Sequence, residues 1–162
     1  MRLYPLSLLI TAAVLIPNVL YLRFPPSDAA NYGEPRDSLP FKIIERAGQA
    51  SSFIMPLFFP LSFGRALQIG AWAVMGLALA LYYAGWIRYF SRGRHYALLF
   101  SPMIGIPVPM AVGPVAYFLL SAMVLGSNWQ AVAAVVLAIG HITITFRESV
   151  RVRGLTEPPQ GV

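Results

Sequence analysis

The residues best suited to do chemistry are a few polar side chains that interrupt long apolar stretches. Glu45, Gln49, Ser52 and Pro56 recur at spacings of four, three and four residues. This spacing places them on one face of one helix, which begins with charged residues and continues into an apolar run. We interpret this face as a polar seam that enters an apolar environment from its edge. The alternative is that Glu45 only pairs in water with a basic neighbour.

Two further polar residues lie within apolar segments. Asn18 follows Pro17, whose ring removes one hydrogen bond of a helix and leaves a carbonyl free. Asn18 therefore either caps its own backbone or faces a polar interior cavity. His141 stands six residues before Arg147, close to the end of an apolar run. It is either a neutral imidazole bonded to a carbonyl or a functional group, the default for an ionisable residue inside a membrane span.

The chemistry open to these residues is limited. The sequence contains no cysteine, which excludes disulfides, thiolate nucleophiles and thiolate metal ligands. It also contains no zinc motif, no phosphate-binding glycine loop and no Gly-x-Ser-x-Gly elbow. His95 and His141 could line one cavity with Glu45, Arg46 and Arg88, but their spacing does not require it. We therefore predict no catalytic residue and no metal site, and the sequence names no cofactor.

The segments that position these residues are strongly apolar. Hydrophobic residues make up 57% of the 162 residues and charged residues 11%, and the mean hydropathy is +0.66. Soluble domains contain about 25% charged residues, and a soluble fold could not bury this much apolar surface. Runs of about 20 apolar residues are long enough to cross a bilayer. The sequence therefore predicts an all-α integral membrane protein whose main partner is the lipid bilayer.

We predict one domain, a bundle of five transmembrane helices. The expected spans are residues 3–22, 47–63, 66–87, 106–125 and 129–146, with a polar loop at 23–46 and a flexible tail at 148–162. A short interfacial helix around residues 96–101, or a re-entrant piece, would precede the fourth span. Pro107 and Pro109 would interrupt that span, as in transporters that bind substrate at broken helices. Prolines near the beginning of a span are also ordinary.

Two other patterns bear on how the helices pack. Small residues spaced four apart form faces that another helix could approach closely, and these residues are Gly76, Ala80 and Ala84 in one span and Ala134 and Ala138 in another. Aromatic residues cluster at the end of the third span, namely Tyr82, Tyr83, Trp86 and Tyr89. Such a cluster is typical of rings anchored at the headgroup level, and an aromatic ligand box is the alternative.

The basic residues indicate how the chain is threaded. With five spans, one side carries ten of the twelve arginines and lysines, and the other carries only Arg2 and Arg65. Cytoplasmic loops of membrane proteins are the basic ones. This predicts a cell-membrane protein with its N-terminus outside and its C-terminus in the cytoplasm. The net charge of +6 then needs no nucleic-acid partner, since the chain has no basic run with interleaved aromatic residues.

Several stretches carry a resemblance to a known group. They are Trp86-Ile87-Arg88-Tyr89-Phe90, Ile106-Pro107-Val108-Pro109-Met110-Ala111, Gly140-His141-Ile142 and Glu45-Arg46-Ala47-Gly48-Gln49. In them the chain resembles a group of uncharacterised bacterial multi-pass membrane proteins, mainly over its C-terminal half. The resemblance implies a bacterial inner membrane and brings no known activity. In size and number of spans the chain is also similar to the translocator (tryptophan-rich sensory) family, but it lacks that family's Trp-Pro-rich segments.

Three functions remain open. The first is a non-enzymatic protein that binds or passes a small amphipathic or apolar ligand, with candidate binding residues Asn18, Glu45, Gln49, Arg88, Pro107, Pro109 and His141. The second is an accessory subunit whose small-residue faces dock on a larger membrane complex or on a second copy. The third is a membrane-embedded, lipid-modifying enzyme that uses Glu45 and His141. The sequence favours the first and does not specify the ligand.

Overall fold

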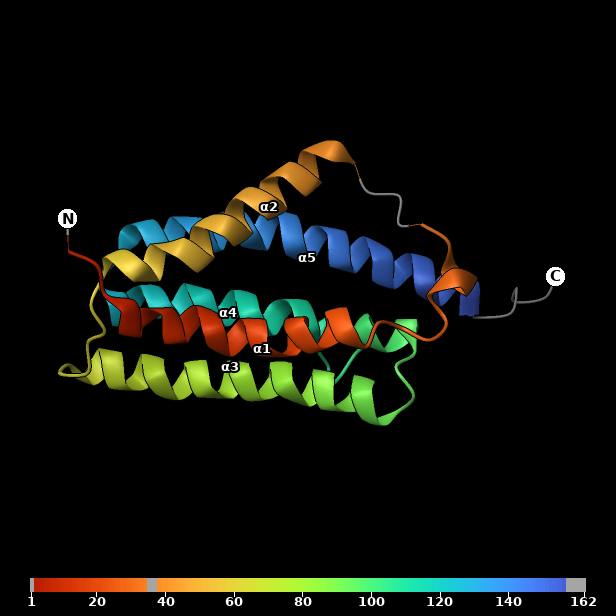
Figure 1. Ribbon diagram of the computed structural model, residues 1–162, viewed down its shortest axis with the longest axis horizontal. Helices are drawn as coiled ribbons and strands as arrows, with labels where there is room; N and C mark the ends of the chain where they lie inside the picture. Colours follow the sequence, from red (N-terminus) through yellow and green to blue (C-terminus); the bar gives the residue numbers. More distant parts are fainter. Residues whose placement is uncertain (1, 35–37, 157–162) are drawn as a thin grey trace.

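The helices of the protein run back and forth along one long axis. The computed structural model describes residues 2–34 and 38–156. Within them the α-helices are α1 (Leu8–Arg23), α2 (Leu39–Ile54), α3 (Ala66–Ser91), α4 (Pro109–Leu125) and α5 (Asn128–Thr156). Short 3-10 helices are η1 (Pro5–Ser7), η2 (Ala29–Tyr32), η3 (Met55–Phe58) and η4 (Tyr96–Leu99). Successive α-helices alternate in direction (Figure 1), and the predicted all-α class is confirmed.

Three helical segments are long and apolar enough to cross a membrane. They are Pro5–Arg23, α3 and α5, with 19, 26 and 29 residues. α4 is a shorter apolar helix of 17 residues. α2 is amphipathic, because its first half carries Lys42, Glu45 and Arg46 while its second half is apolar. By length and composition the protein therefore has three candidate spans and one shorter apolar helix.

The second helical segment ends earlier than the sequence predicts. The expected span covers residues 47–63, but α2 ends at Ile54 and η3 ends at Phe58. Phe59 has an extended backbone because the residue before a proline, here Pro60, is pushed out of the helical region. The chain then runs without helix to the start of α3. Pro56, which lies in η3, and Pro60 thus end the helical segment before residue 63.

The start of α2 also differs from the prediction. Residues 23–46 are expected to form a polar loop, yet α2 begins at Leu39 and a short helix, η2, lies inside the loop. Ser38 has the extended backbone of a residue that precedes a helix, and Pro40 occupies the first turn, where a missing N–H is harmless. The loop is therefore shorter than predicted, and the charged part of α2 is helical.

The expected flexible tail is largely helical. The prediction places it at residues 148–162, but α5 continues to Thr156. Buried Val152 and a hydrogen bond of 3.1 Å from Ser149 Oγ to the carbonyl of Phe100 attach this part of α5 to the rest of the protein. These contacts explain why the helix does not end at the charged residues. The last residues, 157–162, lie outside the described part.

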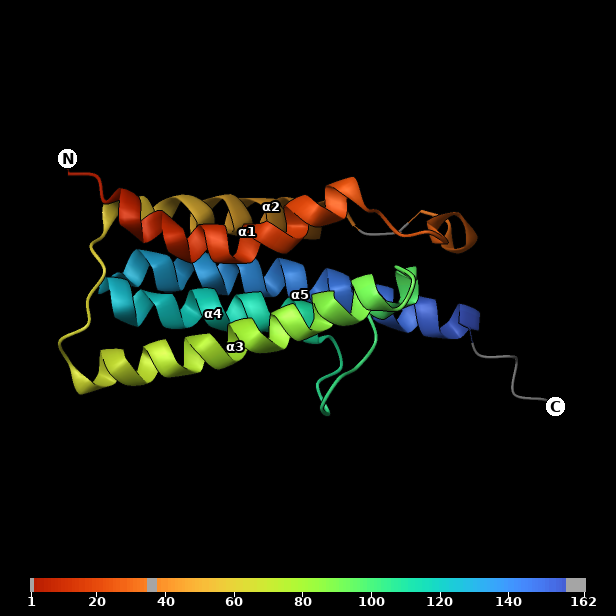
Figure 2. The same ribbon diagram turned by 60° about the horizontal axis from the view of Figure 1, so that its bottom comes forward.

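The helices form a row with one helix in front of it. α2 packs on α5, α5 on α4, and α4 on α3. Figure 1 shows this row, with α1 crossing in front of α4, and Figure 2 shows the same order from a second direction. The row places α4 and α5 in the interior and leaves much of α3 exposed to its surroundings.

The closest packing in the protein lies between α2 and α5. Gly48 of α2 touches the backbone of Leu137, and Gly140 of α5 touches the backbone of Glu45. A Cβ atom at either glycine would overlap the opposite backbone, so no larger residue fits. Ala134 of α5, one of the residues predicted to pack, is fully buried. Glycine thus lets the two helices meet backbone to backbone, as small residues do in membranes.

A second close contact joins α3 to α4. Gly113 of α4 lies against Tyr82 and the carbonyl of Ala78, and Gly85 of α3 lies against Met110. The inward face of α3 is therefore the one that carries Gly85. The residues predicted to form a packing ridge on this helix, Gly76, Ala80 and Ala84, are exposed on another face. That ridge is not used within the chain, and its role toward another chain stays a prediction.

α1 is attached mainly through hydrogen bonds rather than through close packing. The Tyr83 hydroxyl donates to the carbonyl of Ala13 at 2.8 Å, and that carbonyl is the one freed by Pro17 four residues later. Thr11 Oγ1 donates to the carbonyl of Phe53 at 2.8 Å. Backbone groups that are shielded from water need such partners. Side chains of neighbouring helices therefore hold α1 at a distance from the row.

The basic residues gather at the two ends of the bundle in unequal numbers. Arg2 and Arg65 lie at the end where α1 and α3 begin. The other described basic residues lie toward the opposite end, and they are Arg23, Lys42, Arg46, Arg88, Arg92, Arg94, Arg147, Arg151 and Arg153. Arg36 is outside the described residues. The asymmetry predicted from the sequence is thus present in space.

We predict that Gly140→Leu destabilises the protein by about 1–3 kcal/mol, the usual cost of overpacking. The added side chain would meet the backbone of Glu45, which cannot rotate away as a side chain can. Thermal unfolding of the detergent-solubilised protein measures this as a lower Tm. The control is Gly76→Leu, where nothing lies within 4 Å and no loss is expected. Equal melting of the two variants would contradict the backbone contact.

Candidate functional site

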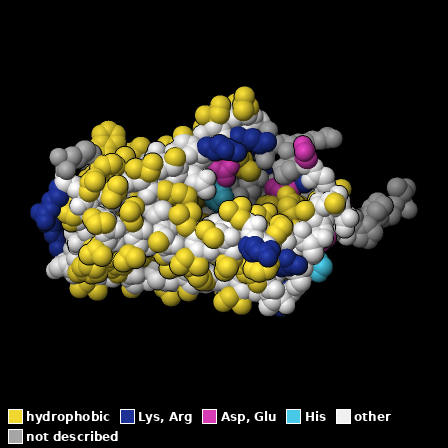
Figure 3. All heavy atoms as spheres, viewed as in Figure 1, with side chains coloured by type: hydrophobic (Ala, Val, Ile, Leu, Met, Phe, Trp, Pro, Cys, Tyr) yellow, Lys and Arg dark blue, Asp and Glu magenta, His cyan; other side chains and the backbone are white. Residues whose placement is uncertain are grey.

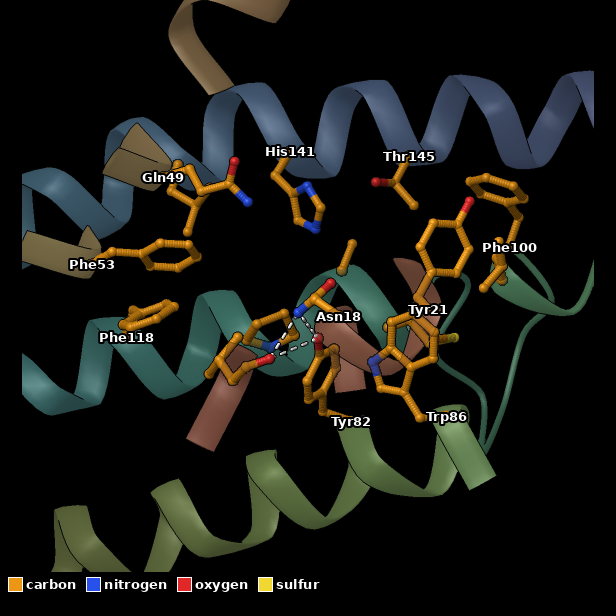
Figure 4. Close-up of a pocket in the computed structure, with 16 residues that line it drawn as sticks. Asn18, Tyr21, Gln49, Phe53, Tyr82, Trp86, Phe100, Phe118, His141 and Thr145 are labelled. Atoms are coloured by element: carbon orange, nitrogen blue, oxygen red, sulfur yellow. Dashed lines mark hydrogen bonds between the residues drawn. The ribbon is translucent and has the colours of Figure 1, made fainter. Parts of the chain in front are cut away.

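One cavity is shared by all five helices. Its volume is about 220 Å³. It is lined by Val14, Asn18 and Tyr21 from α1, Gln49 and Phe53 from α2, Tyr82 and Trp86 from α3, Leu99 and Phe100 from the η4 segment, Met110, Ala111, Pro114 and Phe118 from α4, and Leu137, His141 and Thr145 from α5. Figure 4 shows these side chains converging between α1, α3, α4 and α5. The cavity exists because α1 stands away from the row behind it.

Much of the cavity wall is aromatic. Tyr21 packs edge-on against Trp86 with ring centroids 5.7 Å apart, and Trp86 packs edge-on against Tyr82 at 6.1 Å. On the opposite side Phe53 and Phe118 lie 5.5 Å apart. Each ring restricts its neighbour, and such pairs favour tilted and edge-to-face geometries. The wall is therefore preformed rather than assembled by a ligand.

Asn18 both caps its own helix backbone and faces the cavity, the two alternatives that the sequence leaves open. Its Nδ2 donates to the carbonyl of Val14 and to the hydroxyl oxygen of Tyr82, each at 2.7 Å. The first bond caps its own helix and the second links α1 to α3. Both amide hydrogens are then used, and the amide oxygen points into the cavity toward His141 (Figure 4). Asn18 is thus a backbone cap whose acceptor faces the cavity.

Glu45 and His141 form a pair between α2 and α5. His141 Nδ1 lies 2.6 Å from Glu45 Oε1, and both side chains are about three-quarters buried, with 28% and 23% of their surfaces exposed. The contact of Gly140 with the Glu45 backbone brings the two residues together. The other ring nitrogen, Nε2, points into the cavity (Figure 4). A carboxylate accepts hydrogen bonds, so it places the imidazole proton on Nδ1.

The mouth of the cavity lies beside α2. Gln49, one turn after Glu45, lines the cavity next to His141 (Figure 4). Figure 3 shows the surface hollowed beside α2, with acidic and histidine side chains at the edge of the hollow and basic side chains above it. The polar seam predicted on this helix therefore borders an opening. Ser52, on the same predicted face, is fully buried instead.

Trp86 lines the cavity, although the sequence predicts that it anchors the helix at the headgroup level. The cluster around it is interpreted as an anchor at the headgroup level, yet Trp86 is only 7% exposed and Tyr82 and Tyr89 are also buried. Trp86 Nε1 is buried without a hydrogen-bond partner among the residues described, and it lies on the side of the ring toward Tyr82 (Figure 4). The aromatic ligand box, the alternative reading of the cluster, is the one that this placement matches.

Arg88 supports the cavity without lining it. Its guanidinium donates to the carbonyls of Leu98, Ser101 and Pro102 at 2.9 to 3.0 Å. These bonds hold the segment around η4, which corresponds to the short helix expected near residues 96–101. The same segment supplies Leu99 and Phe100 to the cavity wall. Arg88 is therefore a positioning residue, because it fixes the backbone of residues that line the cavity.

The prolines predicted to line a ligand site are displaced from it. Pro107 is exposed in the loop before α4, and Pro109 is buried as the first residue of α4. Proline suits this first position because no N–H is needed there, so α4 begins at 109 rather than at 106 as expected. Pro114, which lies inside α4, lines the cavity instead. The helix break thus precedes the cavity.

A network of charged and polar groups closes the basic end of the bundle. Asp28 accepts from the backbone N–H of Tyr96 at 2.7 Å and lies 3.0 Å from His95 Nδ1. The Tyr96 hydroxyl donates to Glu148 at 2.9 Å, and Glu148 also binds Arg151. His95 is thus paired with Asp28, whereas His141 is paired with Glu45. The network ties the first loop and η4 to the last turns of α5.

Hydrogen bonding shifts the pKa of Asp28. Partial burial raises the pKa of this carboxyl, but the hydrogen bonds from Tyr96 N–H and from His95 outweigh it, and the net pKa lies below its ordinary value. A lowered carboxyl pKa contributes stability above the pKa of the unfolded chain, about 3.9. That stability is lost as the pH falls through the folded-state value.

The described residues form no cluster of metal ligands. No group of three His, Cys, Asp or Glu side chains within residues 2–34 and 38–156 is placed to hold a metal ion.

Comparison with family models, with curated proteins and with solved structures finds no match to this chain. A functional conclusion therefore rests on the geometry of the cavity.

We predict that Asp28→Asn lowers the Tm at pH 5 by an amount that corresponds to at most about 1 kcal/mol, because the pair with His95 is partly exposed. The difference from the unmodified protein should shrink as the pH falls below about 4, since the carboxyl is then protonated. Thermal unfolding in detergent between pH 5 and pH 3 measures it. Glu34→Gln, in the exposed part of the same loop, is the control. A difference that does not change with pH would contradict the role given to Asp28.

Proposed function

We propose that the protein is a small multi-pass membrane protein that binds a small amphipathic or apolar ligand in the cavity between its five helices. The observation that carries the proposal is the convergence of Asn18, Gln49 and His141 on one aromatic-lined space. These residues come from three different helices, and each interrupts an apolar segment. A few placed polar groups within an apolar wall are the usual make-up of small-molecule sites.

The size of the cavity sets the size of the ligand. A cavity of about 150 Å³ lined by apolar side chains binds benzene, and this one measures about 220 Å³. One ring with a short substituent therefore fits, whereas a porphyrin or a sterol does not. A longer apolar chain would have to leave through the mouth beside α2. The ligand class is thus a small ring compound or the ring end of a longer molecule.

Five crossings are supported by the geometry of the bundle. Three segments are long and apolar enough by themselves. α4 has 17 residues and is therefore about 26 Å long at 1.5 Å per residue, close to the hydrocarbon thickness of a bilayer. α2 and η3, from Leu39 to Phe58, pack against α5. Because successive helices alternate in direction, all five would cross the same slab.

The orientation in the membrane follows from the unequal ends. The end that carries nine described basic residues would face the cytoplasm, and the end with Arg2 and Arg65 would face outward. The cavity mouth then lies toward the cytoplasmic half of the bilayer, because Glu45 sits in the basic half of α2. A ligand could reach it from the cytoplasmic interface.

This threading can be tested with single cysteines, because the chain contains none. Gly64→Cys lies at the end with few charges and Asn31→Cys lies in the loop at the basic end, and both positions are exposed. In intact cells a membrane-impermeant maleimide should label Gly64→Cys and leave Asn31→Cys unlabelled until the cells are opened. The reverse pattern would overturn the orientation, and labelling of both from outside would overturn the number of crossings.

Binding is favoured over catalysis by what surrounds His141. The Glu45–His141 pair resembles the base of a nucleophilic site, but no serine or threonine hydroxyl in the described residues is hydrogen-bonded to His141. A nucleophile and its base normally lie within hydrogen-bond reach of each other. The pair therefore serves better to hold a polar group of a ligand than to activate a nucleophile.

We predict that filling the cavity abolishes ligand binding. Ala111 of α4 lines the cavity and is almost fully buried, so the ring in Ala111→Phe would occupy the space. Binding of 1-fluoro-4-propylbenzene to the protein in nanodiscs, followed by fluorine NMR, should weaken at least tenfold. Ala73→Phe, on the exposed face of α3, should bind as the unmodified protein does. Unchanged binding by Ala111→Phe, with its helical content and Tm intact, would contradict the proposed site.

A further inference from the structure

Some side chains that line the cavity have one hydrogen-bonding atom occupied by the protein and another that faces the cavity. His141 Nδ1 is engaged by Glu45 at 2.6 Å. A neutral imidazole with its proton on Nδ1 carries a lone pair on Nε2 and accepts there. That nitrogen points into the cavity (Figure 4). The first free group is therefore a hydrogen-bond acceptor whose tautomer the Glu45 carboxylate sets.

The second free group is also an acceptor. Asn18 Nδ2 uses its two hydrogens on the Val14 carbonyl and the Tyr82 hydroxyl. Turning the amide over would lose the bond to the Val14 carbonyl, because the amide oxygen has no hydrogen to donate. The amide oxygen points into the cavity from the side opposite His141 (Figure 4). Two acceptors thus face the same space, and neither can donate to the other.

The third free group is a donor. Trp86 Nε1 is buried and has no hydrogen-bond partner in the described part of the chain, and the residue is only 7% exposed. Its ring lines the cavity between Tyr21 and Tyr82. A buried N–H without a partner costs free energy, so a ligand oxygen placed there would be held. These two acceptors and one donor face the aromatic cavity beside Gln49, Tyr21 and Thr145, whose side chains can both donate and accept.

We propose that the ligand is a lipophilic phenol, that is, an apolar aromatic ring that carries a free hydroxyl. This inference rests on the proposed function, since it names the chemical class that the same cavity takes. A hydroxyl donates one hydrogen bond and accepts others. Its hydrogen would bond His141 Nε2 or the Asn18 amide oxygen, and its oxygen would accept from Trp86 Nε1. The ring then packs against the aromatic wall, where ring pairs gain energy beyond area burial.

Two other ligand classes match the cavity less well. A ketone or an ether accepts from Trp86 but leaves the acceptors of Asn18 and His141 facing it without a donor. An organic ammonium satisfies the acceptors and stacks on the rings, but it gives Trp86 Nε1 nothing to bind. Only a group that both donates and accepts can bond Trp86 Nε1 and, at the same time, donate to one of the two acceptors. This difference makes the hydroxyl testable.

The test compares three ring compounds that differ in one group, which are 4-propylphenol, its methyl ether 4-propylanisole, and 4-propylbenzylamine. Each competes with 1-fluoro-4-propylbenzene for the protein in nanodiscs at pH 8, and fluorine NMR reports the displacement. We expect the phenol to bind about tenfold more tightly than the methyl ether, because sites built to bond a hydroxyl discriminate against analogues without it. The amine should bind less tightly than the phenol.

Substitutions then assign the preference to individual residues. His141→Leu and Asn18→Leu each remove one acceptor, and the variant that removes the acceptor of the phenol hydrogen should reduce the preference for the phenol over the ether to below about threefold. Trp86→Phe keeps the ring but removes the donor, so it should weaken the phenol and the ether alike and leave the preference intact. Asn31→Leu, an exposed asparagine in η2, is the matched control and should change nothing.

The outcomes separate this inference from the proposed function. Equal binding of phenol and ether, or tighter binding of the amine, would overturn the phenol and leave a ligand-binding cavity in place. A preference that survives both His141→Leu and Asn18→Leu would also overturn it. If the fluorinated probe itself does not bind, both the proposed function and the inference of a phenol ligand are wrong. If Asn18→Leu does not fold, the contrast between His141→Leu and Trp86→Phe decides.

Discussion

The backbone contact between α2 and α5 is the constraint on which the rest of the structure depends. Gly48 and Gly140 let the two helices approach until their backbones touch, and in lipid this close packing replaces the hydrophobic drive that holds soluble helices together. The contact has a chemical consequence, because Gly140 touches the backbone of Glu45 and the next residue, His141, then meets the Glu45 carboxylate. The amphipathic half of α2 is thereby joined to the interior of the bundle.

The opposite arrangement holds α1. This helix is kept away from the row by aromatic side chains, and hydroxyl groups from α3 connect it through the backbone carbonyls near Pro17. Proline creates the free carbonyl, Tyr83 satisfies it, and Asn18 satisfies the next one along. A helix attached by hydrogen bonds across large rings leaves space that close packing would have filled. The cavity is therefore a product of how α1 is attached, and its walls are the rings that keep α1 apart.

Two of the polar groups of the cavity, the imidazole of His141 and the amide of Asn18, are held by hydrogen bonds to other residues. Glu45 orients the imidazole of His141, Val14 and Tyr82 orient the amide of Asn18, and Arg88 holds the segment that contributes Phe100. In a medium of low dielectric constant such bonds are strong and an unsatisfied group is costly. The free atoms that remain are thus directed rather than mobile, which is the condition for selecting a ligand by its hydrogen-bonding pattern. The network of charged and polar groups at the basic end, which includes Asp28 and Glu148, restrains the loops that border this space.

The sequence by itself determined the all-α class, the position of most helices, the unequal ends, and a set of polar residues that includes Asn18, Gln49 and His141. These follow from local properties, namely apolar length, proline position, charge count and the helical spacing of the seam on α2. Tertiary structure alone decided that Glu45 meets His141 across 96 residues, that Trp86 turns inward, and that Gly76 turns outward. The physical reason is that α3 is apolar on every side, so its periodicity does not tell which face packs inside. The inward face is set by where glycines on neighbouring helices allow contact, and that depends on pairs of residues far apart in the chain.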